Sequence, residues 1–274
     1  MEAQESKNIL ITWDFSNVAE YALQHAIRAA KTINANVVIV HIVEKEKEIE
    51  SATEKMKIVI SDTVAKYGFT PEFVVKEGTI FKTISETADE YKAIFVIMGT
   101  HGIKGMQKIT GSWALRVIAG SKMPFIVVQK PPMDQQLTSI TYPVDYKKED
   151  KQKSVWAVYL NKYFKSKLYM FVQKSTDATL TKHIQANVIF TKNVFDNQGI
   201  EYEVVEAPGV IDFSEETVNY AKEINSDAIL ITTTKNIDIA DYMFGATEQK
   251  IIANKEGVTV MCVNPKEGKI TGFN

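Results

Sequence analysis

Hydrophobic residues follow two alternating patterns along the first half of the chain. Short apolar runs rich in β-branched residues are typical of strands that are covered on both faces of a sheet. Between these runs, apolar residues recur every three or four positions, which is the spacing of an amphipathic helix. The five apolar runs are N-I-L-I-T-W (8–13), N-V-V-I-V-H-I-V (36–43), F-V-V (73–75), A-I-F-V-I-M (93–98) and P-F-I-V-V (124–128).

This alternation predicts an α/β fold with a parallel sheet flanked by helices. In such a sheet, ligands bind at the carboxyl ends of the strands, where the direction of winding reverses. Periodicity does not show which strands lie on either side of the reversal. If the first and fourth strands are neighbours, Asp14 and Gly99 lie side by side there.

The pattern then starts again. After the stretch K-P-P-M-D-Q-Q (130–136), which predicts a short extended linker, T-S-I-T-Y-P-V-D (138–145) repeats the first strand and its terminal aspartate 131 residues later. Further landmarks recur in the same order at nearly the same offset, which indicates an internal duplication. We therefore predict two tandem doubly wound domains, residues 1–131 and 137–274, each with a five-stranded parallel sheet flanked by helices.

A glycine-containing loop follows the fourth strand. The sequence M-G-T-H-G-I-K-G-M-Q-K-I-T-G-S (98–112) leads into the helical pattern W-A-L-R-V-I. A strand, a glycine loop and a helix start offer backbone N–H groups to a phosphate, because the first N–H groups of a helix lack partners within it. Glycine also lets the backbone approach an anion closely. The alternative is that these glycines only serve a long surface turn.

Composition and charge exclude several classes of protein. The chain has 274 residues, a formal net charge of −2 and no long basic run, which argues against non-specific binding to nucleic acid or to an anionic membrane. A polar N-terminus and the lack of any stretch near 18 apolar residues predict neither a signal peptide nor a membrane span. The single cysteine, Cys262, excludes an intrachain disulfide framework. We therefore expect a cytoplasmic protein.

The sequence contains no convincing catalytic constellation. It has no Walker loop, no G-x-G-x-x-G dinucleotide motif and no G-x-S-x-G elbow. Its four histidines and one cysteine form no zinc motif. We assign no catalytic or metal-ligating residue, and the sequence favours a protein that is not an enzyme, with slow ATP hydrolysis left open.

These features together resemble the universal stress protein family, in the form of two domains in one chain. The resemblance covers nearly the whole chain and is carried by I-L-I-T-W-D-F-S, V-V-I-V-H-I-V and M-G-T-H-G…G-S. Nucleotide-binding members of that family carry glycine, two residues, glycine, nine residues, glycine and then Ser or Thr. The resemblance implies an ATP site in which this loop holds the phosphates, which bring Mg²⁺, and the aspartate after the first strand reaches the ribose.

Carried onto this sequence, the resemblance implies a set of nucleotide contacts. The phosphates would bind Gly99, Gly102, Gly111 and Ser112, the ribose Asp14, and the adenine the backbone near Ile42; the neighbouring Thr12, Met98 and Trp113 complete the candidate set. Two features depart from the family pattern. Eight residues separate Gly102 from Gly111, one fewer than in the family, and Thr12 stands where proline is common.

Each candidate also has a structural alternative. Asp14 can assist Ser16 at a helix N-terminus, and Ser112 can be an N-cap. His25 falls on the apolar side of the first helix, where we expect a core histidine with satisfied hydrogen bonds. The basic residues of the loop are expected to form a solvated edge; they are His101, Lys104 and Lys108.

The second half repeats the scaffold without the loop glycines. Counting back from Gly245, Gly99 and Gly102 correspond to Thr233 and Asn236, within one residue, and Ser112 corresponds to Ala246. Side chains at these positions restrict the backbone, and nearby aspartates would repel a phosphate. We therefore predict that the second half does not bind nucleotide and has a structural or partner-binding role.

Two functions from different classes follow. In the first, the N-terminal domain binds ATP or a related adenine nucleotide and the protein is a nucleotide-responsive stress module. In the second, a nucleotide-free stress or interaction protein acts through its surface and assembly. The fifth strands end the two halves, and an unpaired apolar edge strand invites association. The resemblance implies that these strands pair with one another in an internal pseudo-dimer, which leaves a homodimer of chains open.

Overall fold

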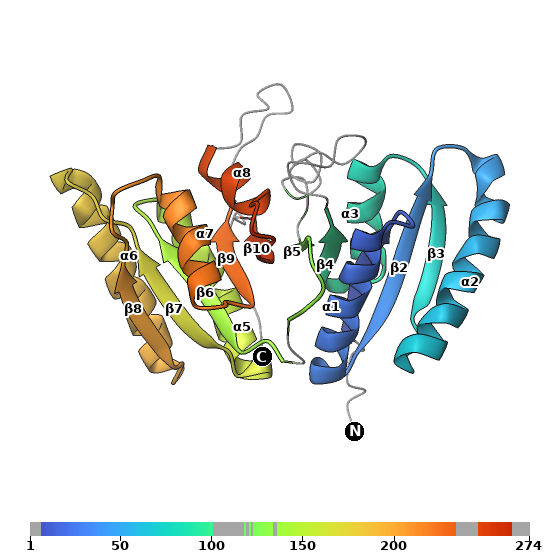
Figure 1. The fold of residues 1–274 in the computed structure, drawn as a ribbon, viewed down its shortest axis with the longest axis horizontal. Helices are drawn as coiled ribbons and strands as arrows, with labels where there is room; N and C mark the ends of the chain where they lie inside the picture. The colour runs from blue at the N-terminus through green and yellow to red at the C-terminus, as the bar shows by residue number, and fades with distance from the viewer. Residues whose placement is uncertain are drawn as a thin grey trace.

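The strands form one continuous sheet. The computed structural model describes residues 7–100, 118, 121, 123–133, 136–233 and 246–264. The strand order is β3-β2-β1-β4-β5-β10-β9-β6-β7-β8, and Figure 1 shows the two halves on either side of β5 and β10. The strands are β1 (Lys7–Trp13), β2 (Ala35–Val43), β3 (Glu72–Glu77), β4 (Ala93–Gly99), β5 (Phe125–Val128), β6 (Ser139–Val144), β7 (Lys167–Val172), β8 (Tyr202–Glu206), β9 (Ala228–Thr232) and β10 (Val260–Val263).

Helices flank the sheet and begin and end at local signals. Ser16 caps α1 by accepting a hydrogen bond from the Ala19 N–H, and Gly68 ends α2 with a φ of 60°. The helix N-terminus expected at Ser16 is confirmed. The helices are α1 (Asn17–Ile33), α2 (Ile49–Tyr67), α3 (Ile80–Glu90), α5 (Ser154–Phe164), α6 (Ala178–Asn197), α7 (Phe213–Glu223) and α8 (Ala246–Ile252), with short 3-10 helices at Glu46–Glu48 and Lys148–Lys153.

Strand pairing confirms the predicted fold class. Every pairing within each half is parallel. β5 and β10 instead pair antiparallel, with Ile126 opposite Met261 at the centre. The expected pairing of the two fifth strands is thus confirmed.

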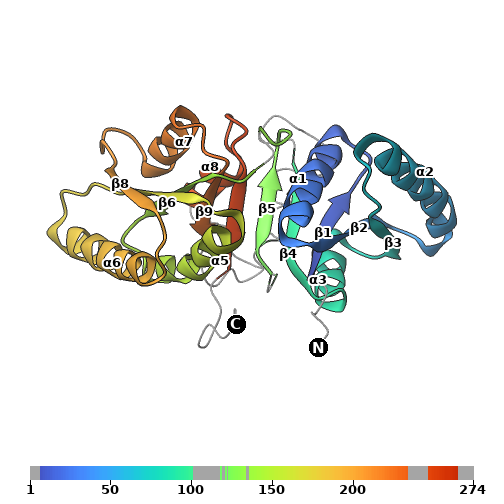
Figure 2. The same ribbon diagram turned by 90° about the horizontal axis from the view of Figure 1, so that it is seen from below.

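The hydrophobic core is continuous on one face of the sheet and divided on the other. One cluster crosses the junction and contains Met98 and Val127 of the first half with Ile231 and Val260 of the second. On the opposite face, one cluster surrounds α1 and includes Tyr159 of α5, and another lies under α5. Figure 2 shows these two helices on either side of the central strands. In the described part of the chain, every helix is too short or too polar to cross a lipid bilayer.

Candidate functional site

The winding of the first half reverses between β1 and β4. Ile11 of β1 pairs with Ile39 of β2 on one side and with Ile97 of β4 on the other. β3 lies beyond β2 and β5 lies beyond β4, so the chain winds outward in one direction and then in the other. The condition that the first and fourth strands are neighbours is therefore met. Asp14 and Gly99 follow the paired residues at the same end of the sheet, where such folds bind ligands.

A recess opens at this end of the sheet, between the carboxyl ends of β1, β2 and β4 and the start of α3. It brings together five of the nine predicted site residues: Thr12, Asp14, Ile42, Met98 and Gly99. Its other lining residues are Trp13, Ala19, Val40, His41, Ile80 and Ile84. The remaining predictions fall outside the described residues; they are Gly102, Gly111, Ser112 and Trp113.

Most of the recess is aliphatic. Val40, Ile84 and Met98 form its buried floor, and Ile42 and Ile80 pack against the same core cluster. Ile42 lies one residue beyond the last pair between β1 and β2, so β1 does not cover its backbone. An apolar slot with an uncovered backbone edge suits a planar heteroaromatic ring, whose faces are apolar and whose edge carries hydrogen-bonding groups.

Asp14 has a structural role and still presents a carboxylate oxygen to the solvent. Its Oδ1 accepts hydrogen bonds from the backbone N–H of Ser16, at 3.0 Å, and from the Ser16 hydroxyl. The structural alternative for Asp14 is therefore present in the molecule. Its Oδ2 makes no hydrogen bond with any residue that the structure describes, and the residue is exposed. The carboxylate can accept hydrogen bonds from a ligand without releasing the turn.

Phe15 lies next to the recess, beside the lining residue His41, and the sequence reasoning missed both residues. Its φ of 62° lies in the left-handed region, which costs a bulky residue about 1–2 kcal/mol. The ring is 43% exposed and makes an edge contact with His41, with ring centroids 4.7 Å apart. His41 is held in turn by donating from Nδ1 to the Trp13 carbonyl at 2.8 Å. These contacts hold the strained turn that presents Asp14.

Gly99 is required by packing, whatever else it binds. A Cβ atom at this position would lie 2.1 Å from the carbonyl oxygen of Val18 and 2.9 Å from the backbone nitrogen of Ala19. Both atoms belong to the first turn of α1, so the glycine lets that helix rest directly on the end of β4. Packing against α1 therefore explains why a glycine stands at position 99, whether or not it also contacts a phosphate.

The described residues contain no group of three or more His, Cys, Asp or Glu side chains that could hold a metal ion. Within the recess, Asp14 is the acidic side chain and His41 already donates to Trp13. Any divalent cation at this edge would need further ligands from what it accompanies, such as phosphate oxygens.

Strand pairing fixes the equivalence between the two halves. Gly99 pairs with Val128 of β5, and Thr232 pairs with Val263 of β10. Thr232 thus occupies the place of Gly99, one residue earlier than Thr233, the position obtained by counting back from Gly245. Thr233 is the counterpart of Thr100, since the backbone N–H of each donates to the last carbonyl of its fifth strand at 2.9 Å.

In the second half, aromatic rings fill the place of the aliphatic slot. The counterpart of Val40 is Phe171, because each lies opposite the equivalent residue of its first strand. The Phe171 ring stacks on Phe213, the first residue of α7, with centroids 5.8 Å apart, and on Tyr220, at 4.6 Å. The protein's own side chains therefore occupy the volume in which a base would lie.

A lysine also covers the second aspartate. Asp145 makes the same turn as Asp14, accepting from the backbone N–H of Lys147 at 2.8 Å. The Lys147 ammonium lies 3.9 Å from Asp145 and 2.7 Å from the buried carboxylate of Glu248. Burial would lower the pKa of Lys147, but the hydrogen bond and charge of Glu248 outweigh it and raise that pKa. In the second crevice, the charge of Asp145 is therefore balanced by a lysine of the same half.

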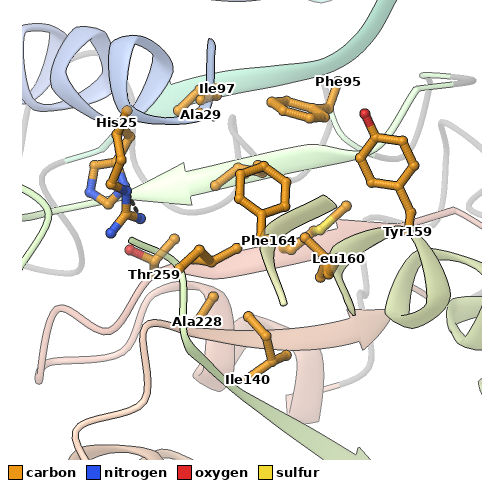
Figure 3. Close-up of a pocket in the computed structure, with 14 residues that line it drawn as sticks. His25, Ala29, Phe95, Ile97, Ile140, Tyr159, Leu160, Phe164, Ala228 and Thr259 are labelled. Atoms are coloured by element: carbon orange, nitrogen blue, oxygen red, sulfur yellow. Dashed lines mark hydrogen bonds between the residues drawn. The ribbon is translucent and has the colours of Figure 1, made fainter. Parts of the chain in front are cut away.

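A second hollow lies at the junction of the halves, between α1 and α5. Figure 3 shows His25 at one end of it and Phe95 and Tyr159 at the other. Its enclosed volume is about 40 Å³, whereas that of the recess beside Asp14 is about 90 Å³. A water needs roughly 10–15 Å³ and benzene binds in a cavity of about 150 Å³. This seam cavity is thus a packing defect of a few water volumes, and the recess is the better candidate site.

His25 is a buried histidine with satisfied hydrogen bonds, as the sequence predicts. Its Nε2 donates to the Lys130 carbonyl at 3.1 Å, and its Nδ1 accepts from Arg28 at 3.3 Å. Burial, followed by the charge of Arg28, lowers the pKa of His25 to about 3. Arg28 forms an ion pair with Asp227 of the second half at 3.4 Å. This cluster joins the halves and contacts no part of the recess.

Known proteins resemble both the first half and the whole fold. Residues 5–129 match the model described as the universal stress protein family. A universal stress protein of Methanocaldococcus jannaschii is 33% identical over 141 residues, covering 46% of this chain and 83% of the relative. A second one from that organism is 27% identical over 156 residues, covering 45% and 95%.

A solved universal stress protein from Archaeoglobus fulgidus has the same fold across both halves. It aligns with a TM-score of 0.75 and 18% identity, covering 96% of this chain and 100% of that one. The match of sequence with the first M. jannaschii relative extends over most of that protein's length. Together with the strand order and the family model, it shows that the chain belongs to the universal stress protein family.

Proposed function

We propose that the first half of this protein binds ATP or a related adenine nucleotide and acts as a nucleotide-responsive regulatory module. One observation carries the proposal. The strand reversal brings Asp14, Ile42, Met98 and Gly99 into one recess that combines an aliphatic slot with an available carboxylate oxygen. The adenine would lie in the slot near Ile42, and Asp14 would accept from the ribose hydroxyls. Thr12 completes the wall beside them.

The same proposal assigns the phosphates to the residues that follow β4. Gly102, Gly111 and Ser112 would hold them, Trp113 is the next residue of the candidate set, and the phosphates would bring Mg²⁺ with them. Gly99 would serve here through its backbone, since its lack of a side chain is already explained by α1. No residue is assigned to catalysis.

The second half is proposed to remain free of nucleotide. Stacked rings fill its slot and Lys147 covers its aspartate. We interpret the halves as domains of residues 1–131 and 137–274 that form an internal pseudo-dimer through β5 and β10. The single cysteine suits a reducing compartment, and we propose a cytoplasmic location.

The matched pair Asp14→Asn and Asp145→Asn tests the proposal. Asparagine keeps the Oδ1 acceptor that closes each turn but removes the charge. A hydrogen bond to a charged group is worth about 1.5–3 kcal/mol, so Asp14→Asn should weaken Mg·ATP binding by tenfold or more, measured by calorimetry. Asp145→Asn should leave the affinity unchanged.

A second measurement looks for nucleotide that copurifies with the protein. The purified wild-type chain is denatured by heat and the supernatant is assayed for adenine nucleotide. Absence of released nucleotide together with no heat of binding at millimolar Mg·ATP would rule out the nucleotide module. That result would support the alternative, a nucleotide-free interaction protein.

A further inference from the structure

A hydroxyl group stands among the aliphatic side chains of the slot. Thr12 of β1 lines the recess, and the strand register places it opposite Val40 of β2. Ile11 pairs with Ile97 of β4, so the next residues along these two strands, Thr12 and Met98, lie side by side. Thr12 is therefore flanked by Val40 and Met98, which belong to the buried floor of the recess.

The alternation of side chains along β1 shows which face Thr12 occupies. Its neighbours Ile11 and Trp13 belong to the core cluster around α1. Leu10, two residues earlier, belongs to the cluster on the opposite face, together with Met98. Because side chains two residues apart in a strand project to the same face, Thr12 projects toward the floor of the recess.

The Thr12 hydroxyl has no hydrogen-bond partner among the residues that the structure describes. Thr12 is half-buried, so solvent reaches the hydroxyl while the recess is open. A planar ring in the slot would exclude that solvent. A hydroxyl left without a partner then costs affinity, whereas an acceptor on the ring would satisfy it. Thr12 therefore favours a ring that carries a hydrogen-bonding atom at this place.

The second half has no hydroxyl at the equivalent place. Pro143 of β6 pairs with Phe171 as Thr12 pairs with Val40. In that half, the Phe171 ring stacks on Tyr220 in the volume of the slot. The hydroxyl is thus present in the half whose slot is open and absent from the half whose slot is filled. Pro143 also shows that the fold accepts a residue without a polar side chain at this register.

We propose that Thr12 determines which base the recess accepts, by donating a hydrogen bond to the ring nitrogen N3 of the bound adenine. This inference rests on the proposed function, in which the base lies near Ile42 at the end of β2 and the ribose lies near Asp14 after β1. N3 is an acceptor on the edge of the purine that carries the ribose. Thr12 lies on β1, two residues before Asp14, so its hydroxyl faces that edge of the ring.

Thr12→Val and Thr12→Ser test the hydroxyl in the full-length chain. Valine keeps the branched shape of the side chain and removes the hydroxyl, whereas serine keeps the hydroxyl. The net value of a neutral hydrogen bond corresponds to about threefold to tenfold in affinity. Thr12→Val should weaken Mg·ATP binding by that factor in calorimetry, and Thr12→Ser should bind within about twofold of the wild type. Equal weakening by both variants would contradict the role of the hydroxyl.

A nucleotide analogue identifies the atom that the hydroxyl meets. In 3-deaza-ATP a C–H group replaces N3, and the rest of the nucleotide is unchanged. The wild type should bind the Mg²⁺ complex of this analogue about threefold to tenfold more weakly than Mg·ATP, whereas Thr12→Val should bind the two with equal affinity. The difference between these two ratios isolates the contact, as in a double-mutant cycle. If the two proteins discriminate equally between the nucleotides, Thr12 does not contact N3 and the proposal is overturned.

Thr141→Val is the matched control in the second half. Thr141 lies on β6, and its buried hydroxyl has no hydrogen-bond partner in the described part of the chain. Its replacement should leave the affinity for Mg·ATP unchanged. Because neither hydroxyl bonds within the protein, both valine variants should unfold at the wild-type temperature or above it. A lower unfolding temperature in Thr12→Val alone would show a structural role for its hydroxyl and count against the proposal.

The wild-type titration separates this inference from the proposed function. If the wild type binds no Mg·ATP, the proposed function fails. If the wild type binds Mg·ATP and Thr12→Val binds it equally well, the proposed function stands and the role of Thr12 alone is rejected.

Discussion

Asp14 and Asp145 occupy equivalent places in the two halves, but their neighbours give them different abilities to bind a ligand. Each closes the turn after its first strand by accepting a backbone N–H. Asp14 then keeps an oxygen for the solvent, whereas Lys147 covers Asp145. A search for conserved aspartates would treat the two positions alike, but their neighbours determine which one can bind a ligand.

Replacement of Gly99 should also reveal how closely α1 packs on β4. Gly99→Ala should lower the free energy of unfolding by about 1–3 kcal/mol or more, because its Cβ would overlap the backbone of α1. Gly68→Ala is the control: its φ is 60° but no atom lies within 4 Å of the added Cβ, so about 1 kcal/mol is expected. Urea unfolding of both variants measures which one loses more of its free energy of unfolding.

A smaller loss for Gly99→Ala than for Gly68→Ala would show that α1 can shift away from β4. The comparison also has a practical meaning for the site. Loss of nucleotide binding in a Gly99 variant would not identify a phosphate contact, since the fold itself is disturbed.

At the scale of elements, local signals were readable from the sequence and non-local pairing was not. The N-cap at Ser16 and the end of α2 at Gly68 each depend on a few adjacent residues, and the helix start at Ser16 was predicted. The adjacency of β1 and β4 depends on pairing across the chain and could only be stated as a condition. The equivalence of Thr232 with Gly99 needed the strand register, since counting gave Thr233.

The filling of the second crevice was also hidden from the sequence. The aspartates expected to repel a phosphate in the second half are Asp238 and Asp241, and both lie outside the described residues. The groups that fill the crevice come from separate elements: Lys147 after β6, Phe213 at the start of α7 and Glu248 in α8. No local pattern brings these residues together. The strain at Phe15 was hidden from the sequence as well, because it lies in the backbone angle φ and not in any sequence pattern.

The Lys147–Glu248 pair gives the prediction at this scale, because it ties the end of β6 to α8. Lys147→Met should lower the free energy of unfolding by about 1–3 kcal/mol, since it leaves the buried Glu248 carboxylate without its lysine. Lys147→Met/Glu248→Gln should regain at least half of that loss. Urea unfolding at neutral pH measures both, and a double variant less stable than Lys147→Met would contradict the account.

At the scale of the whole molecule, hydrophobic packing crosses the junction on both faces, and one face also carries a cavity and a polar cluster. The continuous core joins the halves on the α3 and α7 side. On the α1 and α5 side, Tyr159 of α5 packs with the cluster around α1, the seam cavity lies beside it, and Arg28 forms an ion pair across the junction with Asp227. The junction is therefore more sensitive to charge on this second face.

The pH dependence of stability follows from His25. Its pKa is about 3 in the folded protein and about 6.5 in an unfolded chain, so the unfolded chain binds more protons between these values. The free energy of unfolding therefore falls as the pH drops below about 6.5, by up to about 1.4 kcal/mol per pH unit. Between pH 7 and pH 5, the wild type should lose about 1–2 kcal/mol more than His25→Gln.

His183→Gln is the control for this measurement, because His183 is exposed on α6. It should keep the wild-type slope of the unfolding free energy against pH. If His25→Gln shows the same slope as the wild type, the buried neutral histidine is not what makes the junction sensitive to acid.

The pairing of β5 with β10 also has a consequence for mass action. The two strands belong to one polypeptide, joined through the short stretch between Val128 and Ser139. Such a tether holds its two ends at an effective concentration on the order of millimolar. The halves therefore stay together at any dilution, and the continuous sheet across the junction forms independently of how much protein a cell contains.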